Sequence, residues 1–77
     1  MSYSDWEQID FSDYHELYYI ACTRYKKEWS EGIKKEIVKI GEKCKKSLGL
    51  TSSQSVTHKE LYKYIDENDL LKDFPDR

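Results

Sequence analysis

Two cysteines and two histidines are the residues of this sequence that could support covalent or metal chemistry. His15 and Cys22 are seven positions apart, a spacing that places both on one edge of a helix, as a Cys–His nucleophile pair would need. Neither a third orienting residue nor a loop able to form an oxyanion hole accompanies them. Since any residue at the border of an apolar helix face produces the same spacing, we expect no catalytic pair here.

A zinc site would require both cysteines and both histidines to converge from separate elements: Cys22, Cys44, His15 and His58. The sequence contains no Cys-x-x-Cys or His-x-x-x-His spacing that would support such a site. The three glycines are isolated, so no phosphate-binding glycine loop is present. The carboxylates lie at positions expected to face solvent. We therefore predict a protein that is not an enzyme, has no metal or cofactor, and keeps both cysteines free and buried.

One segment resembles a DNA-binding motif. A Leu-Gly-Leu-Thr turn at residues 48–51 is followed by polar residues, then by Val56, Thr57 and Leu61. This pattern resembles the turn and recognition helix of helix-turn-helix proteins, with an interval from Thr51 to Val56 that is about one residue longer than in the usual form. The resemblance implies that polar residues of this segment would face a DNA groove: Ser53, Gln54, Ser55, Thr57, His58 and Lys59.

Four lysines would share the outer face of a basic helix and could contact phosphates: Lys35, Lys39, Lys43 and Lys46. Two observations weaken this interpretation. The segment 60–76 is acidic and would repel a polyanion, and any amphipathic helix presents a charged outer face. A helix-turn-helix-like DNA-binding regulator is therefore the alternative function, with nucleic acid as its partner.

The stretch 61–70 also resembles part of the SWIB domain, a helical protein-interaction module. It matches the run Leu-Trp-x-Tyr-Ile-x-x-Asn-x-Leu, except that Tyr62 replaces the tryptophan. The Gln-Asp-Pro that normally follows this run is absent. We assign no family from this match.

Charge is distributed along the chain in blocks, although the net charge is only −2. Residues 1–20 carry five acids and no lysine or arginine, whereas residues 24–46 carry nine bases and four acids. Residues 51–77 carry six acids and four bases. Such a pattern lets an acidic arm fold against a basic helix, or presents a charged face to a partner.

The composition favours protein binding. Seven tyrosines and two tryptophans stand against two phenylalanines. Tyrosine and tryptophan bring large contact area at low entropic cost, and segregated charge steers association. We therefore predict a small non-catalytic regulator or inhibitor that binds another protein through residues of the acidic arm or off the main apolar arc: Tyr3, Trp6, Phe11, Asp13 and Tyr19. For a second aromatic set, the sequence does not decide between the core of a monomer and this binding surface: Tyr14, Tyr18, Tyr25 and Trp29.

Hydrophobic periodicity predicts an all-α single domain, a small bundle of three main helices, and no strand alternation of useful length. The predicted elements are a short turn within an acidic arm over 1–11, helices over 12–29, 31–48 and 57–69, and a hydrophobic tail containing Leu70, Leu71 and Phe74. Gly49 would stop the middle helix, and Thr57 with Glu60 would form a capping box for the last one. The middle helix has an apolar arc of only about 80°, close to a two-helix seam, so a homodimer is a further expectation.

No apolar run approaches the ~18 residues of a membrane span, and the N-terminus has neither a basic nor an apolar leader segment. We therefore expect a cytoplasmic protein without a membrane partner. Lysine outnumbers arginine eleven to two, a bias typical of A/T-rich genomes that fits a phage, a virus or another mobile element.

Overall fold

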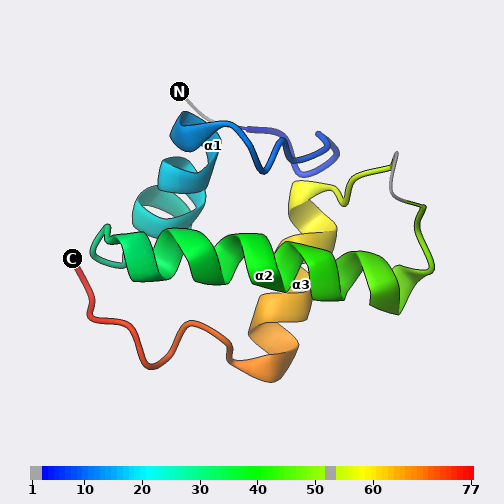
Figure 1. The fold of residues 1–77 in the computed structure, drawn as a ribbon. Coiled ribbons are helices and arrows are strands. Elements are labelled where there is room, and N and C mark those ends of the chain that lie inside the picture. The colour runs from blue at the N-terminus through cyan, green and yellow to red at the C-terminus, as the bar shows by residue number, and fades with distance from the viewer. Residues whose placement is uncertain (1–2, 52–53) are drawn as a thin grey trace.

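Residues 3–51 and 54–77 are described by a computed structural model, in which helices pack around one apolar core (Figure 1). The elements are α1 (Tyr14–Tyr18), a π-helix η1 (Tyr19–Arg24) that continues it, α2 (Glu31–Leu48) and α3 (His58–Asn68). Among the described residues there is no strand, only two isolated β-bridges. No helix of this part of the chain is both long and apolar enough to cross a membrane. The all-α prediction is confirmed.

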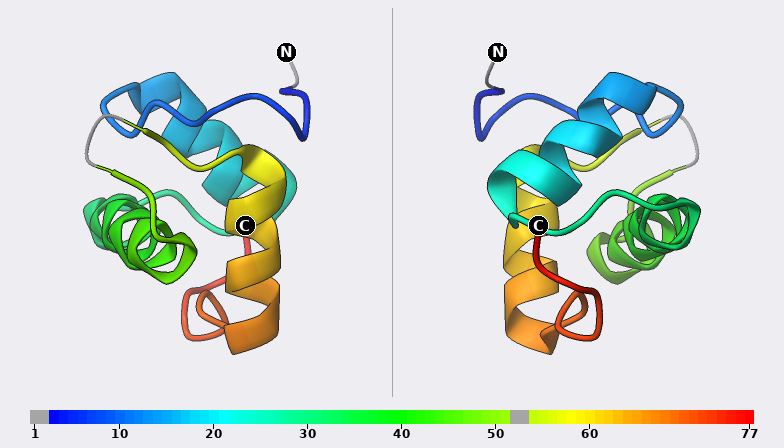
Figure 2. Two further views of the ribbon diagram at one scale, coloured as in Figure 1. Left: turned by 90° about the vertical axis from the view of Figure 1, so that its right-hand side faces the viewer. Right: turned by 90° about the vertical axis from the view of Figure 1, so that its left-hand side faces the viewer.

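The helices are arranged in two layers. α2 forms one layer, and α3 crosses it steeply on one side (Figures 1 and 2). α1 and η1 lie on that same side, over the N-terminal half of α2. Because both partners of α2 lie on one side, the other side of α2 is open to solvent.

α2 begins and ends where local signals predict. The Ser30 side chain accepts a hydrogen bond from the Ile33 N–H at 3.2 Å, and Gly49 ends the helix in the left-handed region with a φ of 70°. Its apolar arc is buried within the chain: Ile33, Ile37, Ile40, Gly41 and Cys44. The seam from which we expected a homodimer is therefore covered by the chain's own helices.

The predicted helix over 12–29 is too long at both ends. Asp13 is the N-cap, with its carboxylate accepting from the His15 N–H, and the helical structure ends at Arg24. Residues 25–29 leave the helix because they pair with the end of the chain: the Glu28 N–H donates to the Pro75 carbonyl at 2.9 Å. A long-range pairing thus overrides the amphipathic period of this segment.

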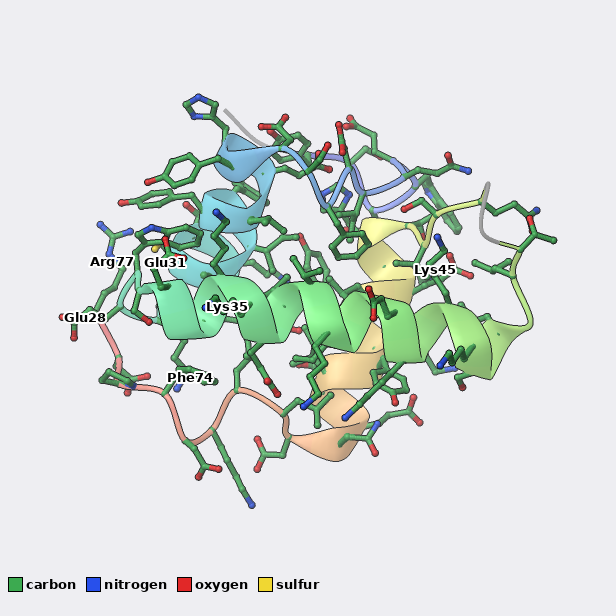
Figure 3. All side chains as sticks on the ribbon, viewed as in Figure 1. Glu28, Glu31, Lys35, Lys45, Phe74 and Arg77 are labelled. Carbon is green, nitrogen blue, oxygen red and sulfur yellow. The ribbon has the colours of Figure 1, made fainter. Side chains whose placement is uncertain are left out.

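The C-terminal tail returns to the start of α2. α3 ends at Asp69, a non-glycine residue in the left-handed region with a φ of 51°. Leu71 is buried in the core, and the side chain of Phe74 packs from the tail against the first turn of α2 at Gly32 (Figure 3). Lys27 then holds the tail through an ion pair with Asp76 at 2.8 Å and a hydrogen bond to the Phe74 carbonyl.

Phe11 takes part in this packing. The tip of its half-buried ring lies against α2 at Gly41. A Cβ built on Gly41 would come within 3.0 Å of three carbons of that ring. The partner contact expected of Phe11 stays a prediction, since α2 covers part of the ring and leaves the side chain half-buried.

We predict that Gly41→Ala lowers the free energy of unfolding. Forcing a methyl group into this contact costs about 1–3 kcal/mol, partly offset by the helix propensity of alanine, which is worth about 1 kcal/mol. The net loss, up to about 2 kcal/mol, is measured by urea unfolding followed by circular dichroism.

The matched control is Gly32→Ala on the same helix. A Cβ at Gly32 meets its nearest atoms, in Phe74 and Ser30, at 3.7 Å, which is ordinary contact. This variant should be neutral or more stable by up to about 1 kcal/mol. If Phe11 causes the loss, then Gly41→Ala should cost nothing in a Phe11→Ala background; an undiminished cost there would contradict the explanation.

Candidate binding surfaces

The N-terminal arm (residues 3–11) lies against the start of α3 and supplies its missing hydrogen-bond partners (Figure 2). The first N–H groups of an α-helix have no acceptor within the helix. Here the His58 N–H donates to the Glu7 carbonyl and the Lys59 N–H donates to the Asp5 carbonyl, each at 3.0 Å. The arm is therefore fixed by backbone groups, independently of most of its side chains.

The same contact buries His58 completely. Its Nδ1 lies 2.9 Å from the Glu7 carbonyl, and the ring of Tyr3 stacks over the imidazole with centroids 5.0 Å apart. On the other side Nε2 lies 3.1 Å from Oε1 of Glu16, close enough for an ion pair but without the alignment of a hydrogen bond. His58 thus holds the arm onto the helices, and the expectation that it faces a DNA groove is wrong.

Glu16 is the buried carboxylate of this contact. Its Oε2 accepts a hydrogen bond from the Asp10 N–H at 3.2 Å, which fixes the arm at a second point. Burial raises the pKa of Glu16 above its ordinary value, and this effect outweighs the Asp10 hydrogen bond and the nearby His58, which both lower it. The folded protein therefore binds a proton at Glu16 more tightly than the unfolded chain does.

We predict that Glu16→Gln changes how stability depends on pH. With a raised folded-state pKa, protonated Glu16 contributes stability fully below its unfolded pKa of about 4.5, and this contribution is lost as the pH rises through the higher folded pKa. The unfolding free energy of the wild type relative to Glu16→Gln should therefore fall as the pH is raised from about 4. Urea unfolding of both proteins across the range measures the difference.

Glutamine keeps an acceptor for the Asp10 N–H, so the comparison changes the charge and leaves the hydrogen bond. If the wild-type unfolding free energy minus that of Glu16→Gln stays constant between acidic and neutral pH, burial does not shift the pKa of Glu16. If this difference rises with pH, the pairing with His58 outweighs the cost of burial.

An open pocket of about 460 Å³ lies between the arm and the first helix. Its lining residues are Tyr3 from the arm and His15, Tyr18, Tyr19 and Thr23 from α1 and η1. The rings of Tyr3 and Tyr19 meet edge to face with centroids 4.9 Å apart. We call this the tyrosine pocket.

Acidic groups act on one wall of the tyrosine pocket. The pKa of Tyr3 is raised, first by desolvation and then by the negative charges of Glu16, Asp13 and Glu7. The Tyr3 hydroxyl therefore lies in a locally negative electrostatic field.

Two of the predicted binding residues, Tyr3 and Tyr19, line this pocket, and a third, Asp13, acts on Tyr3 through its charge. Tyr19 is half-buried and packs against the core as well as against Tyr3. Asp13 is half-buried and caps α1. Of the other lining residues, the sequence suggests His15 only for covalent or metal chemistry, does not decide between core and surface for Tyr18, and does not predict that Thr23 binds a partner. Their signal is the helical spacing, since positions 15, 18, 19 and 23 repeat at intervals that fall on one face of a helix.

A cluster of aromatic rings continues from α1. Trp29 contacts the rings of Tyr14 and Tyr18 at centroid distances of 5.2 and 5.4 Å. Tyr14 is 48 % exposed and Tyr18 is 38 % exposed. Of the aromatic set left open by the sequence, these two tyrosines lie at the surface, whereas Tyr25 donates hydrogen bonds to the Tyr62 carbonyl and to Asp66.

A second hollow, about 490 Å³ in volume, lies where the arm, α2 and α3 meet. Trp6 forms one wall and is 73 % exposed, with the ammonium group of Lys59 4.7 Å from its ring centroid. Leu48, at the end of α2, lines the same hollow and is also exposed. Trp6 is therefore the predicted binding residue whose side chain is most available to a partner.

The helix-turn-helix-like segment is largely engaged within the fold. Ser55 donates a hydrogen bond to the Ile9 carbonyl, and Thr57 forms the capping box with Glu60. Gln54 is exposed and accepts from the Thr51 N–H at 3.0 Å. His58 is buried, and the N–H of Lys59 is hydrogen-bonded to the arm. The start of the helix that would enter a DNA groove is therefore occupied by contacts within the chain. Ser53 lies outside the described residues.

The lysine stripe is exposed as expected. Lys35, Lys39, Lys43 and Lys46 all lie at the surface of α2. Within the described residues none of the four has an ion-pair partner. This stripe is the part of the nucleic-acid interpretation that the fold leaves available.

The residues considered for covalent or metal chemistry are dispersed. Cys22 and Cys44 are free and buried, and burial raises the pKa of the Cys44 thiol. His15 is exposed, with its ring against Tyr14, while His58 is enclosed by the arm. In residues 3–51 and 54–77 no three histidine, cysteine, aspartate or glutamate side chains are grouped so that they could hold a metal ion.

Comparisons with protein-family models, with curated protein sequences and with solved structures find no match for this chain. A functional assignment must therefore come from the chemistry and the geometry of its own surfaces. Two of these surfaces are aromatic, at the tyrosine pocket and around Trp6, and one is basic, along α2.

Proposed function

We propose that this protein is a small non-catalytic regulator or inhibitor that binds another protein through the aromatic side chains that the arm and α1 leave exposed. The observation that carries the proposal is the exposure of three large aromatic residues within the acidic first block of the sequence: Trp6, Tyr14 and Tyr18. Such residues dominate the binding energy of protein interfaces when a partner buries them.

The charge around these side chains supports the same function. Asp5, Glu7 and Asp10 are exposed on the arm, and residues 1–20 contain no lysine or arginine. An acidic surface attracts a basic partner and speeds the encounter of the two proteins. The aromatic rings would then provide the contact area that holds the complex together.

Binding is favoured over catalysis by the position of His58 and Glu16. Within the described residues they form the one ion pair that involves a histidine. Tyr3 covers the imidazole and both side chains are buried, so a substrate could not reach them. The pair is accounted for by its structural role in holding the arm.

We predict that Trp6→Ser or Tyr18→Ser reduces partner capture about tenfold or more, the effect of removing an aromatic hot spot. The immobilised chain is exposed to cell lysate with and without nuclease, and the captured proteins are quantified by mass spectrometry. A partner that binds through these rings should survive nuclease treatment and be lost from the variants. Circular dichroism checks that both variants keep their helices.

The control is the charge-reversed pair Lys39→Glu and Lys43→Glu, which leaves the arm and α1 unchanged. It should capture the same protein as the wild type. Capture that survives in both aromatic variants would overturn the proposal.

The second candidate is nucleic-acid binding through the lysine stripe, which is exposed on the open side of α2. Its contacts would be to phosphates, so duplex binding should weaken steeply with salt and be lost in the Lys39→Glu and Lys43→Glu double variant. Nuclease-sensitive capture that disappears in this double variant would favour it over protein binding.

A further inference from the structure

The tyrosine pocket has the form of a ligand site. Its volume, about 460 Å³, falls within the range of small-molecule and side-chain pockets. Three of its five lining residues are tyrosines, from two separate segments of the chain. The edge-to-face contact between Tyr3 and Tyr19 holds two of the rings in place.

The chemistry of the pocket selects for positive charge. The faces of aromatic rings carry partial negative charge and attract ammonium and guanidinium groups. The carboxylates of Glu16, Asp13 and Glu7 act on the hydroxyl of Tyr3, one of the lining residues. Aromatic walls and a negative field together favour an organic cation over a neutral or anionic group.

The lysines and arginines of the described residues do not line this pocket. Arg24, the nearest arginine in sequence, lies over the rings of Tyr25 and Tyr62 at 5.1 and 4.6 Å, and Lys59 lies over Trp6. In this part of the chain, cations therefore lie over three other aromatic rings, and none lines the tyrosine pocket.

We infer that the tyrosine pocket takes a lysine or arginine side chain from a basic segment of the partner protein. This inference rests on the proposed function and names the chemistry of the partner. The aliphatic stem of such a side chain would pack between the rings, and its charged end would lie in the field of the carboxylates.

The test uses a short fluorescent peptide with two lysines among glycines and serines, and the same peptide with both lysines acetylated. Acetylation removes the charge and keeps the side chain. We expect the wild-type chain to bind the lysine peptide, to lose binding to the acetylated one, and to bind more weakly at high salt. Equal binding of the two peptides would overturn the inference.

Two matched variants separate the pocket from general attraction to an acidic protein. Tyr18→Ala removes a lining ring, whereas Tyr64→Ala removes a ring of α3 that lies outside the pocket; both keep every charge. Tyr18→Ala should weaken peptide binding about 3- to 30-fold, the value of one cation–π contact, and Tyr64→Ala less than about twofold. Equal losses in the two variants would overturn the inference.

Thr23→Lys provides an independent check. Thr23 is exposed at the edge of the pocket, so this substitution supplies a cation from within the chain at little cost to the fold. It should abolish peptide binding, and unchanged binding would overturn the inference. If the lysine peptide does not bind but a partner is still captured and is lost in Tyr18→Ser, the proposed function stands and only its cationic ligand is wrong.

Discussion

The start of α3 is the point on which the rest of the molecule depends. A helix N-terminus leaves backbone N–H groups that need acceptors, and burying them without partners would be costly. Thr57 caps one of them, and carbonyl groups of the arm accept from two more. This requirement fixes the path of the arm, which covers His58 and places Tyr3 beside α1. The tyrosine pocket exists because the arm is held in this place.

His58 and Glu16 form an unusual centre for so small a protein. Burying a possible ion pair brings little net stability, because desolvation offsets the attraction between the charges. The pair instead fixes the position of the arm. His58 lies on α3 and Glu16 on α1, and both contact the arm, so a displaced arm would leave their polar atoms buried without partners. The contact therefore favours one register of the arm over others, a role in which buried polar groups are well attested.

Local signals in the sequence predicted some features of the fold and not others. The bounds of α2 follow from a serine cap and a stop glycine, both of which act within a few residues. The end of the first helix depends on the pairing of residues 26–28 with 75–77, which no local pattern encodes. The binding residues divide in the same way. The exposure of Trp6 agrees with its place off the apolar arcs, whereas contacts between distant segments bury His58 and cover part of Phe11.

Each end of the described chain contacts a residue far away in the sequence. The contact between His58 and Glu7 closes a separation of 51 residues, and that between Lys27 and Asp76 closes one of 49. Helical proteins of this size usually fold fast because their contacts are local, and closing long loops costs chain entropy before any contact repays it. These long-range contacts should make the chain fold more slowly than helical proteins whose contacts are all local. The tyrosine pocket, built by the arm, depends on one of the long loop closures.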